Sequence, residues 1–280
     1  MSVGPVDIRS VIETRDGVRL AVRDSESGSR LPTILLHGLT LTGEQVLMGS
    51  RKLEENDFRV LACDARGHGD SGAPTDRTRY TYRDLADDVV EVMDALAIER
   101  ALLVGASMGF HTALRVILDH PDRVAGLVGI TPGFDPAETP TAKDLSDADL
   151  TAALMRRSGI EGFVEALEAI GDPLGTIAPD ELRVRMSQHR DLTPLADAVE
   201  RVVRSRPFES LDELGTLEAP VLIVASRDEF DPRHPLRISH AYAAALPRAE
   251  LHCEAKGRAP IAWSRRRLGD LVLDFAQALA

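Results

Sequence analysis

A serine flanked by glycines is the first candidate for chemistry in this chain. Ser107 is the centre of Gly105-Ala106-Ser107-Met108-Gly109, which follows a G-x-S-x-G pattern. An apolar run over 101–104 precedes the pattern, and a helix-like segment follows it up to His120. A sharp strand-to-helix turn of this kind holds its serine in a strained conformation, so the flanking positions must be small. We therefore predict a nucleophile elbow with Ser107 as the nucleophile.

A serine hydroxyl is a weak nucleophile at neutral pH, so it needs a base and a carboxylate that orients the base. The polar stretch over 226–235 follows an apolar run and offers three acids, Asp228, Glu229 and Asp231, together with His234. The other histidines considered for the site are His37, His68, His111 and His252. A lone histidine can be a structural residue as well as a base.

The elements that must position these residues alternate between strands and helices. Alternating apolar and polar residues on both sides of Asp16-Gly17 predict a hairpin of strands over 6–14 and 18–24. Apolar runs predict further strands over 32–36, 58–63, 101–104, 124–130, 220–225 and 249–254. Helices are predicted over 43–56, 82–98, 111–120, 235–246 and 261–279. This order implies a mostly parallel sheet with helices on both faces.

Between 135 and 217 the character of the sequence changes. The segment is rich in Ala, Asp, Glu and Arg at helical spacing and contains no convincing buried strand. A helical block of this length between two strands predicts an inserted lid. The expected organisation is a core made of 1–134 and 218–280, with a helical lid over 135–217.

The composition restricts the possible partners and compartments. Hydrophobic residues at 44% and charged residues at 28% are typical of a globular protein. A net charge of −12 argues against binding to nucleic acid or to an anionic membrane surface. No apolar run approaches the ~18 residues that span a bilayer, and no charged-then-apolar leader opens the sequence, so we expect a cytoplasmic protein. Cys63 and Cys253 are expected to be free thiols, and no cofactor or metal motif is recognised.

Several motifs together resemble the α/β-hydrolase family. His37-Gly38 follows the third predicted strand, the loop from Asp64 to Ser71 follows the fourth, and the elbow follows the fifth. The resemblance covers nearly the whole chain and implies the α/β-hydrolase fold, with an eight-stranded sheet. It also implies that an oxyanion is held by two backbone N–H groups, those of Met108 and Leu39. In such proteins the histidine in the position of His37 usually binds backbone carbonyls, although it can take part in the site.

In this family the acid follows the seventh strand, which leaves the three acids of the 226–235 loop as candidates. A pattern of Asp, three residues, then Pro fits Asp228 equally with Asp231, and counting from the start of the strand points to Glu229. Asp231 is favoured because Asp-Pro-x-His-Pro resembles the acid loop of several bacterial members. Asp228 is close behind.

The base is where the sequence departs from the family. A Gly-His-x-Pro-like turn is expected after the last strand, and this chain has Gly257-Arg258-Ala259-Pro260. An arginine with a pKa above about 12 cannot accept the serine proton. Three explanations stay open: a relocated base, for which His234 is the best candidate; a non-hydrolytic reaction in which Arg258 anchors an anionic substrate; or an inactive homologue that binds a ligand.

The favoured hypothesis is a serine-dependent hydrolase of an ester, thioester or related carbonyl compound. Its expected partner is a small-molecule substrate, and a homo-oligomer is possible. Apolar residues expected to reach inward from the lid, or to form its core, are Phe134, Met155, Phe163 and Met186. Arg258, His37 and Phe134 are the candidate substrate-binding residues.

Overall fold

A computed structural model describes residues 8–170, 177–227, 229, 231 and 233–279 of the chain. Its centre is an eight-stranded sheet in the order β1-β2-β4-β3-β5-β6-β7-β8. The strands are β1 (Ile8–Glu13), β2 (Arg19–Asp24), β3 (Arg30–Leu36), β4 (Phe58–Cys63), β5 (Ala101–Ala106), β6 (Val124–Ile130), β7 (Val221–Ala225) and β8 (Ala249–Cys253). The fold class predicted from the sequence, a mostly parallel eight-stranded sheet with helices on both faces, is confirmed.

The first two strands form the antiparallel hairpin that the Asp16-Gly17 turn predicts. Ile8 pairs with Asp24 and Glu13 pairs with Arg19, and Gly17 has a φ of 81°. β2 also pairs antiparallel with β4, whereas the strands β4-β3-β5-β6-β7-β8 are all parallel to their neighbours. Their carboxyl ends therefore lie along one edge of the sheet, where the connecting loops can bring distant residues together.

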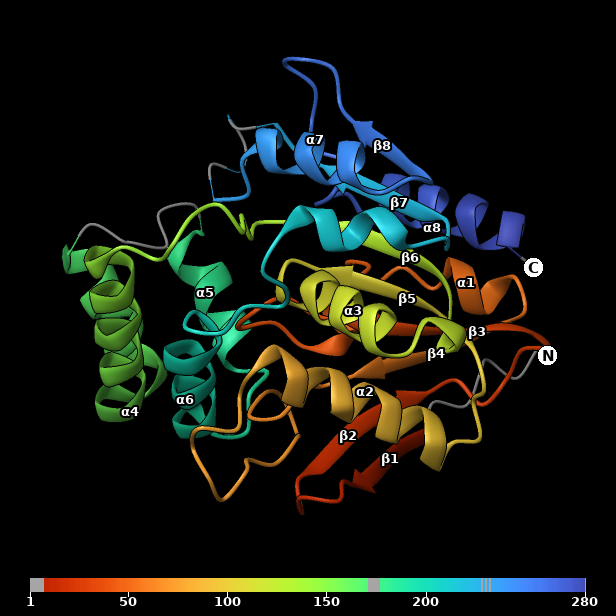
Figure 1. The fold of residues 1–280 in the computed structure, drawn as a ribbon. Coiled ribbons are helices and arrows are strands. Elements are labelled where there is room, and N and C mark those ends of the chain that lie inside the picture. Colours follow the sequence, from red (N-terminus) through yellow and green to blue (C-terminus); the bar gives the residue numbers. More distant parts are fainter. Residues whose placement is uncertain (1–7, 171–176, 228, 230, 232, 280) are drawn as a thin grey trace.

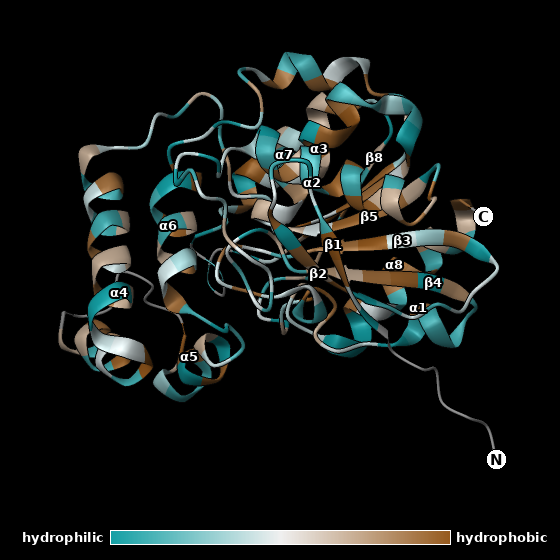
Figure 2. Cartoon of the chain, turned by 90° about the horizontal axis from the view of Figure 1, so that it is seen from below, coloured by the Kyte–Doolittle hydropathy of each residue, from teal (hydrophilic) through white to brown (hydrophobic). Residues whose placement is uncertain are grey.

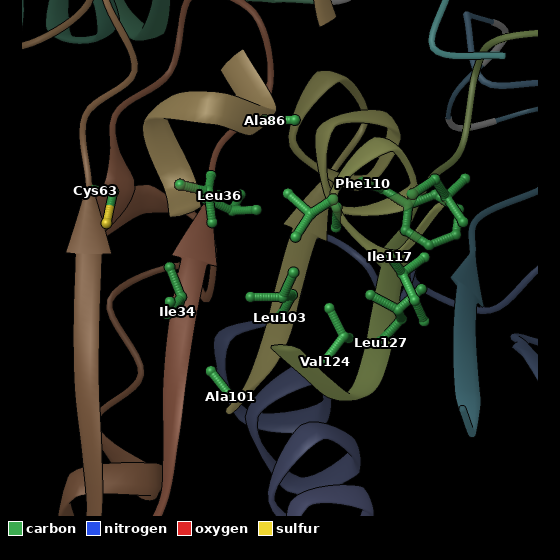
Figure 3. Packing of buried hydrophobic residues seen from close by; sticks show 14 of the residues in the cluster. Ile34, Leu36, Cys63, Ala86, Ala101, Leu103, Phe110, Ile117, Val124 and Leu127 are labelled. Carbon is green, nitrogen blue, oxygen red and sulfur yellow. The ribbon is translucent and has the colours of Figure 1, made fainter. Parts of the chain in front are cut away.

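Helices cover the two faces of the sheet because successive strand residues point to opposite sides. On one face, α2 (Tyr82–Ala95), α3 (Met108–Asp119) and α7 (Leu236–Ala245) pack on residues such as Ile34, Leu103 and Leu127 (Figures 1 and 3). On the other face, α1 (Lys52–Glu55) and α8 (Arg265–Leu279) pack on residues such as Leu35, Leu102 and Val128. Adjacent residues of one strand therefore belong to two separate hydrophobic cores, as Ile34 and Leu35 do in β3.

Three more helices stand beside the sheet: α4 (Ala142–Ile170), α5 (Pro179–Met186) and α6 (Leu192–Val202) (Figure 1). They enclose an apolar cluster of their own that includes Phe163, Leu167 and Met186. Hydrophilic and hydrophobic residues alternate along these helices (Figure 2). Gly159, with φ 62° and ψ −170°, kinks α4. A short 3-10 helix, η3 (Leu211–Thr216), leads back to β7.

The predicted helix over 43–56 is wrong for most of its length. A 3-10 helix, η1 (Gly43–Gln45), is followed by turns, and α1 covers only Lys52–Glu55. Met48 and Gly49 have φ values of 53° and 73°, which lie in the left-handed region and interrupt a right-handed helix. The described part of the chain contains no helix long and apolar enough to cross a membrane.

Candidate active site

Ser107 lies at a strained turn between β5 and α3. Its φ of 46° and ψ of −111° are unfavourable for a residue with a side chain. The turn is held because the Ser107 N–H donates to the Ile130 carbonyl at 2.9 Å, and the N–H groups of Phe110 and His111 return to the Ser107 carbonyl. The backbone thereby projects the serine above the carboxyl ends of the central strands.

The two glycines of the pattern are required by close backbone contacts. A Cβ on Gly109 would lie 1.9 Å from the Leu36 carbonyl oxygen, and one on Gly105 would lie 2.4 Å from the Gly109 carbonyl carbon. Real Cβ atoms do not approach backbone atoms so closely, so neither position tolerates a side chain. The small residues that the pattern implied have a direct steric cause.

His234 provides a titratable group within hydrogen-bonding distance of the serine hydroxyl. It lies in the loop between β7 and α7, and its Nε2 is 2.9 Å from Ser107 Oγ. The loop after β6 makes room for the imidazole, because a Cβ on Gly133 would come within 2.8 Å of His234 Cδ2. His234 therefore reaches the serine from the acid loop rather than from the turn after β8.

Asp231 completes the arrangement from the same loop. Its carboxylate oxygens are 2.9 and 3.0 Å from His234 Nδ1, and the residue is only 6% exposed. A carboxylate beside Nδ1 favours the tautomer with the proton on that nitrogen, which leaves Nε2 free to accept the Ser107 proton. The His234 N–H donates to the Asp231 carbonyl at 3.2 Å, so acid and base share one tight turn.

The other acids of this loop are placed differently. Glu229 is exposed and pairs with Arg227 at 3.3 Å. Asp228 lies outside the described residues. Of the two acids that the structure describes, Asp231 is the one whose contacts lead to a histidine and a serine.

The Gly257–Pro260 turn, where the family has its catalytic histidine, is exposed in this protein except at Pro260. Arg258 is exposed, and its N–H donates to the Ala255 carbonyl at 3.0 Å. The buried Glu254 connects this region to the acid loop, since its carboxylate accepts from the N–H groups of Arg227 at 2.6 Å and Ile261 at 3.2 Å. Among the described residues, no contact of the Arg258 side chain with the serine, His234 or Asp231 is found.

The expected oxyanion donors, Met108 and Leu39, belong to segments that adjoin Ser107. Met108 is the first residue of α3, so its N–H has no partner within the helix. The loop after β3 makes a turn closed by the Leu41 N–H and the Gly38 carbonyl at 3.0 Å, with Leu39 and Thr40 at its centre. A Cβ on Gly38 would lie 3.6 Å from Ser107 Cβ, which places this turn against the serine.

His37 has its ring nitrogens engaged by backbone groups. The Ala65 N–H donates to Nε2 at 2.9 Å, and Nδ1 donates to the Gly38 carbonyl at 2.8 Å. The ring is 1% exposed, and burial lowers its pKa. These contacts leave no ring nitrogen for the substrate-binding role that the sequence suggested, and they match the structural role.

The rings of His68, His111 and His252 have partners other than the serine hydroxyl. His68 is buried and donates to the Arg66 carbonyl at 3.0 Å, and His252 on β8 pairs with Glu250 at 2.5 Å. His111 accepts from the Phe134 N–H at 3.3 Å, and burial, with His234 nearby, lowers the pKa of His111 to about 3. His111 therefore stabilises the loop after β6 through its hydrogen bond with the Phe134 N–H.

The apolar residues expected either to reach inward from the lid or to form its core pack against other apolar side chains. Met155, Phe163 and Met186 are buried in the cluster enclosed by α4, α5 and α6. Phe134 packs edge-to-face on Phe208 with ring centroids 5.4 Å apart. Their packing does not assign any of them to a substrate pocket. The described residues include no group of His, Cys, Asp or Glu able to hold a metal ion.

Sequence reasoning missed one histidine that lies at this edge of the sheet. His189, between α5 and α6, contacts both the loop after β3 and the loop after β4 through backbone atoms. Its partners are far away in the sequence and have no side-chain signature. A histidine in the connection between α5 and α6 was the one available signal.

With this geometry in place, comparisons with known proteins define the class. The profile described as alpha/beta hydrolase fold matches residues 32–173. A putative carbamate hydrolase RutD from Caulobacter sp. (strain K31) is 32% identical, with 85% of this chain and 87% of that protein aligned. The chain therefore belongs to the α/β-hydrolase fold family.

Other similar proteins span several activities. A putative 2-succinyl-6-hydroxy-2,4-cyclohexadiene-1-carboxylate synthase from Bacillus subtilis (strain 168) is 32% identical over 57% of this chain and 58% of its own length. A thermophilic esterase from Thermogutta terrifontis has a TM-score of 0.76 at 23% identity, with 97% of this chain and 99% of the esterase chain covered. This structural likeness supports the fold, while the reaction has to be argued from the site.

Proposed function

We propose that this protein is a serine-dependent hydrolase whose catalytic triad is Ser107, His234 and Asp231. The observation on which the proposal depends is the continuous path from Asp231 through His234 Nδ1 and Nε2 to Ser107 Oγ, with contacts of 2.9 to 3.0 Å. These are hydrogen-bonding distances for a nucleophile, its base and an orienting acid. The histidine missing from the turn after β8 is replaced by one from the acid loop.

Acylation follows from the proposed roles. His234 Nε2 accepts the Ser107 proton as Oγ attacks the substrate carbonyl carbon, and Asp231 stabilises the resulting imidazolium. The negative charge moves to the carbonyl oxygen, where the N–H groups of Leu39 and Met108 donate to it. When the bond to the leaving group breaks, His234 returns the proton to the leaving oxygen, sulfur or nitrogen, and the acyl group stays on Ser107.

Deacylation repeats these steps with water. His234 removes a proton from a water molecule as its oxygen attacks the acyl carbon, and the second tetrahedral intermediate uses the same two donors. Ser107 Oγ leaves, takes the proton from His234, and releases a carboxylic acid or, from a carbamate, a carbamic acid. No redox step is involved, so the reaction balances without a cofactor.

The substrate class is an ester, thioester, carbamate or related carbonyl compound of low molecular weight. The chain's likeness to putative carbamate hydrolases and to esterases supports this class. We further propose that the segment 135–217, which contains α4, α5 and α6, acts as a lid over the site. Leu39 packs against the apolar cluster of these helices, so the lid adjoins the oxyanion turn.

The exposure of Arg258 weighs against a non-hydrolytic reaction anchored by that residue, since an anion anchor needs a position inside the site. The complete set of contacts at Ser107 weighs against an inactive homologue, because a ligand-binding protein needs no His–Asp pair aimed at a serine.

The test is hydrolysis of a panel of p-nitrophenyl acetate, an acyl thioester and an aryl carbamate by wild-type protein and Ser107→Ala. We expect wild-type turnover on at least one substrate, a loss of about 10⁴-fold or more in kcat for the variant, and an acyl adduct on Ser107 in mass spectra of quenched reactions. Turnover by Ser107→Ala at the wild-type rate would overturn the proposal.

A further inference from the structure

The connection between α5 and α6 places a buried imidazole between two loops of the core. His189 is 7% exposed. Its Nδ1 accepts from the Gly69 N–H at 2.9 Å, and its Nε2 donates to the Thr40 carbonyl at 3.0 Å. This pattern requires the neutral ring with its proton on Nε2, and burial lowers the pKa of His189, which favours the neutral form.

The Thr40 carbonyl belongs to the turn that presents Leu39. Thr40 has a φ of 69°, which is unfavourable for a β-branched residue, so its conformation needs support from outside the turn. The Gly38 carbonyl of the same turn accepts from the Leu41 N–H and from His37. His189 provides the corresponding hydrogen bond on the Thr40 side, next to the proposed oxyanion donor.

The partner loop after β4 is fixed to the same lid segment. Gly69 also accepts from the Arg190 N–H at 3.0 Å, and a Cβ on Gly67 would lie 2.9 Å from the Pro194 carbonyl oxygen. His68 in this loop lies between two imidazoles, with ring centroids 4.8 Å from His37 and 5.9 Å from His189. The oxyanion turn is therefore hydrogen-bonded by His37 and by His189 of the lid, and the ring of His68 lies between theirs.

From these contacts we propose that His189 is a positioning residue for the oxyanion hole: the lid uses it to hold the Gly38–Leu41 turn in the geometry that aims the Leu39 N–H at the developing charge. This role depends on the proposed serine hydrolase mechanism. His189 would then affect the rate of the chemical step although its hydrogen bonds go to Gly69 and Thr40 and not to Ser107 or His234. The position of the lid would affect the same rate through this residue.

Removing the hydrogen bonds should affect the transition state more than the ground state, since the oxyanion exists only in the former. We expect His189→Leu to lower kcat for p-nitrophenyl acetate by about 10- to 100-fold, the size of effect caused by a displaced catalytic group. KM should change little. His189→Gln has an amide acceptor and donor that can meet the same two backbone groups, so it should recover most of the lost kcat.

The experiment compares His189→Leu, His189→Gln and Leu167→Ala by steady-state hydrolysis of p-nitrophenyl acetate and by inhibition with phenylboronic acid, which forms a tetrahedral adduct on a serine. Leu167 is buried in the α4–α6 cluster, so Leu167→Ala weakens the lid without removing a contact to Thr40 or Gly69. If His189→Leu does not fold, His189→Asn takes its place, because that side chain is too short to reach both partners.

The expected result is a loss of kcat and an equal loss of boronate affinity in His189→Leu (or His189→Asn), with recovery in His189→Gln and a smaller loss in Leu167→Ala. The proposal is overturned if His189→Leu keeps the wild-type kcat, if only KM changes, or if Leu167→Ala loses as much kcat. Ser107→Ala, measured alongside, distinguishes failure of the hydrolase mechanism from failure of the positioning role. Wild-type activity in Ser107→Ala refutes the hydrolase mechanism. An inactive Ser107→Ala together with an unaffected His189→Leu refutes the positioning role alone.

Discussion

Replacing His234 by glutamine removes the proposed base while disturbing little else. Glutamine cannot accept the serine proton at neutral pH, yet its amide can still donate to the buried Asp231, which has His234 as its partner at 2.9 Å. An alanine would leave that carboxylate buried without its partner and would mix a stability effect into the kinetics. Thermal unfolding of His234→Gln should therefore stay close to that of the wild type.

The magnitude follows from what the residue does. Loss of one triad member lowers kcat by roughly 10⁴- to 10⁶-fold, equivalent to about 5.5 to 8 kcal/mol of transition-state stabilisation. A residual rate of about 10³- to 10⁴-fold over water should persist, because the proposed backbone donors at Leu39 and Met108 are untouched. Weak activity in the variant is thus an expected part of the result.

The assay is initial-rate hydrolysis of p-nitrophenyl acetate with the spontaneous rate subtracted. His252→Gln is the matched control, since His252 on β8 contacts Glu250 and lies outside the site. It should keep the wild-type rate, and so should Arg258→Ala. A His234→Gln variant within tenfold of the wild type would refute the reasoning, as would an Arg258→Ala variant with the larger loss.

Further predictions concern stability. Gly109→Ala places a Cβ 1.9 Å from the Leu36 carbonyl oxygen and should destabilise the fold by about 3 kcal/mol or more, measured by urea unfolding; a variant as stable as the wild type would contradict the contact. Ser107→Gly should be about 1 kcal/mol more stable than Ser107→Ala, because glycine relieves the strain at a φ of 46°, and equal stabilities would show that no strain is stored there. Stability should fall on acidification: the pKa of His111 is lowered to about 3 by burial, so below about pH 6.5 the unfolded chain binds a proton that the folded chain does not. For this group the loss is about 2 kcal/mol between pH 6.5 and 5, and His111→Phe should flatten the dependence; a stability that rises on acidification would contradict it.

Much of the fold could be predicted because its signals are local. The Asp16-Gly17 hairpin and the apolar strands were predictable from turn chemistry and apolar runs alone. The helix over 43–56 was not, since its composition suits a helix while Met48 and Gly49 adopt left-handed conformations in the folded chain. Tertiary packing determines the conformation of this segment, and local helix propensity does not predict it.

The site could be predicted only up to a set of candidates. The sequence pointed to Ser107, favoured Asp231 and ranked His234 first among relocated bases, but it could not show which histidine reaches the serine. That depends on long-range contacts: Gly133 leaves space for the imidazole, and Glu254 ties the acid loop to the turn after β8. His189 was missed because its partners are backbone atoms more than a hundred residues away.

The central claim is that His234, from the acid loop, activates Ser107. The most direct measurement is the rate at which a fluorophosphonate probe labels Ser107, followed by peptide mass spectrometry, in wild type, His234→Gln and Arg258→Ala. This rate reports the nucleophile itself and needs no knowledge of the natural substrate. We predict labelling of Ser107 in the wild type and in Arg258→Ala, and its near loss in His234→Gln. Labelling of Ser107 in His234→Gln at the wild-type rate would contradict the account.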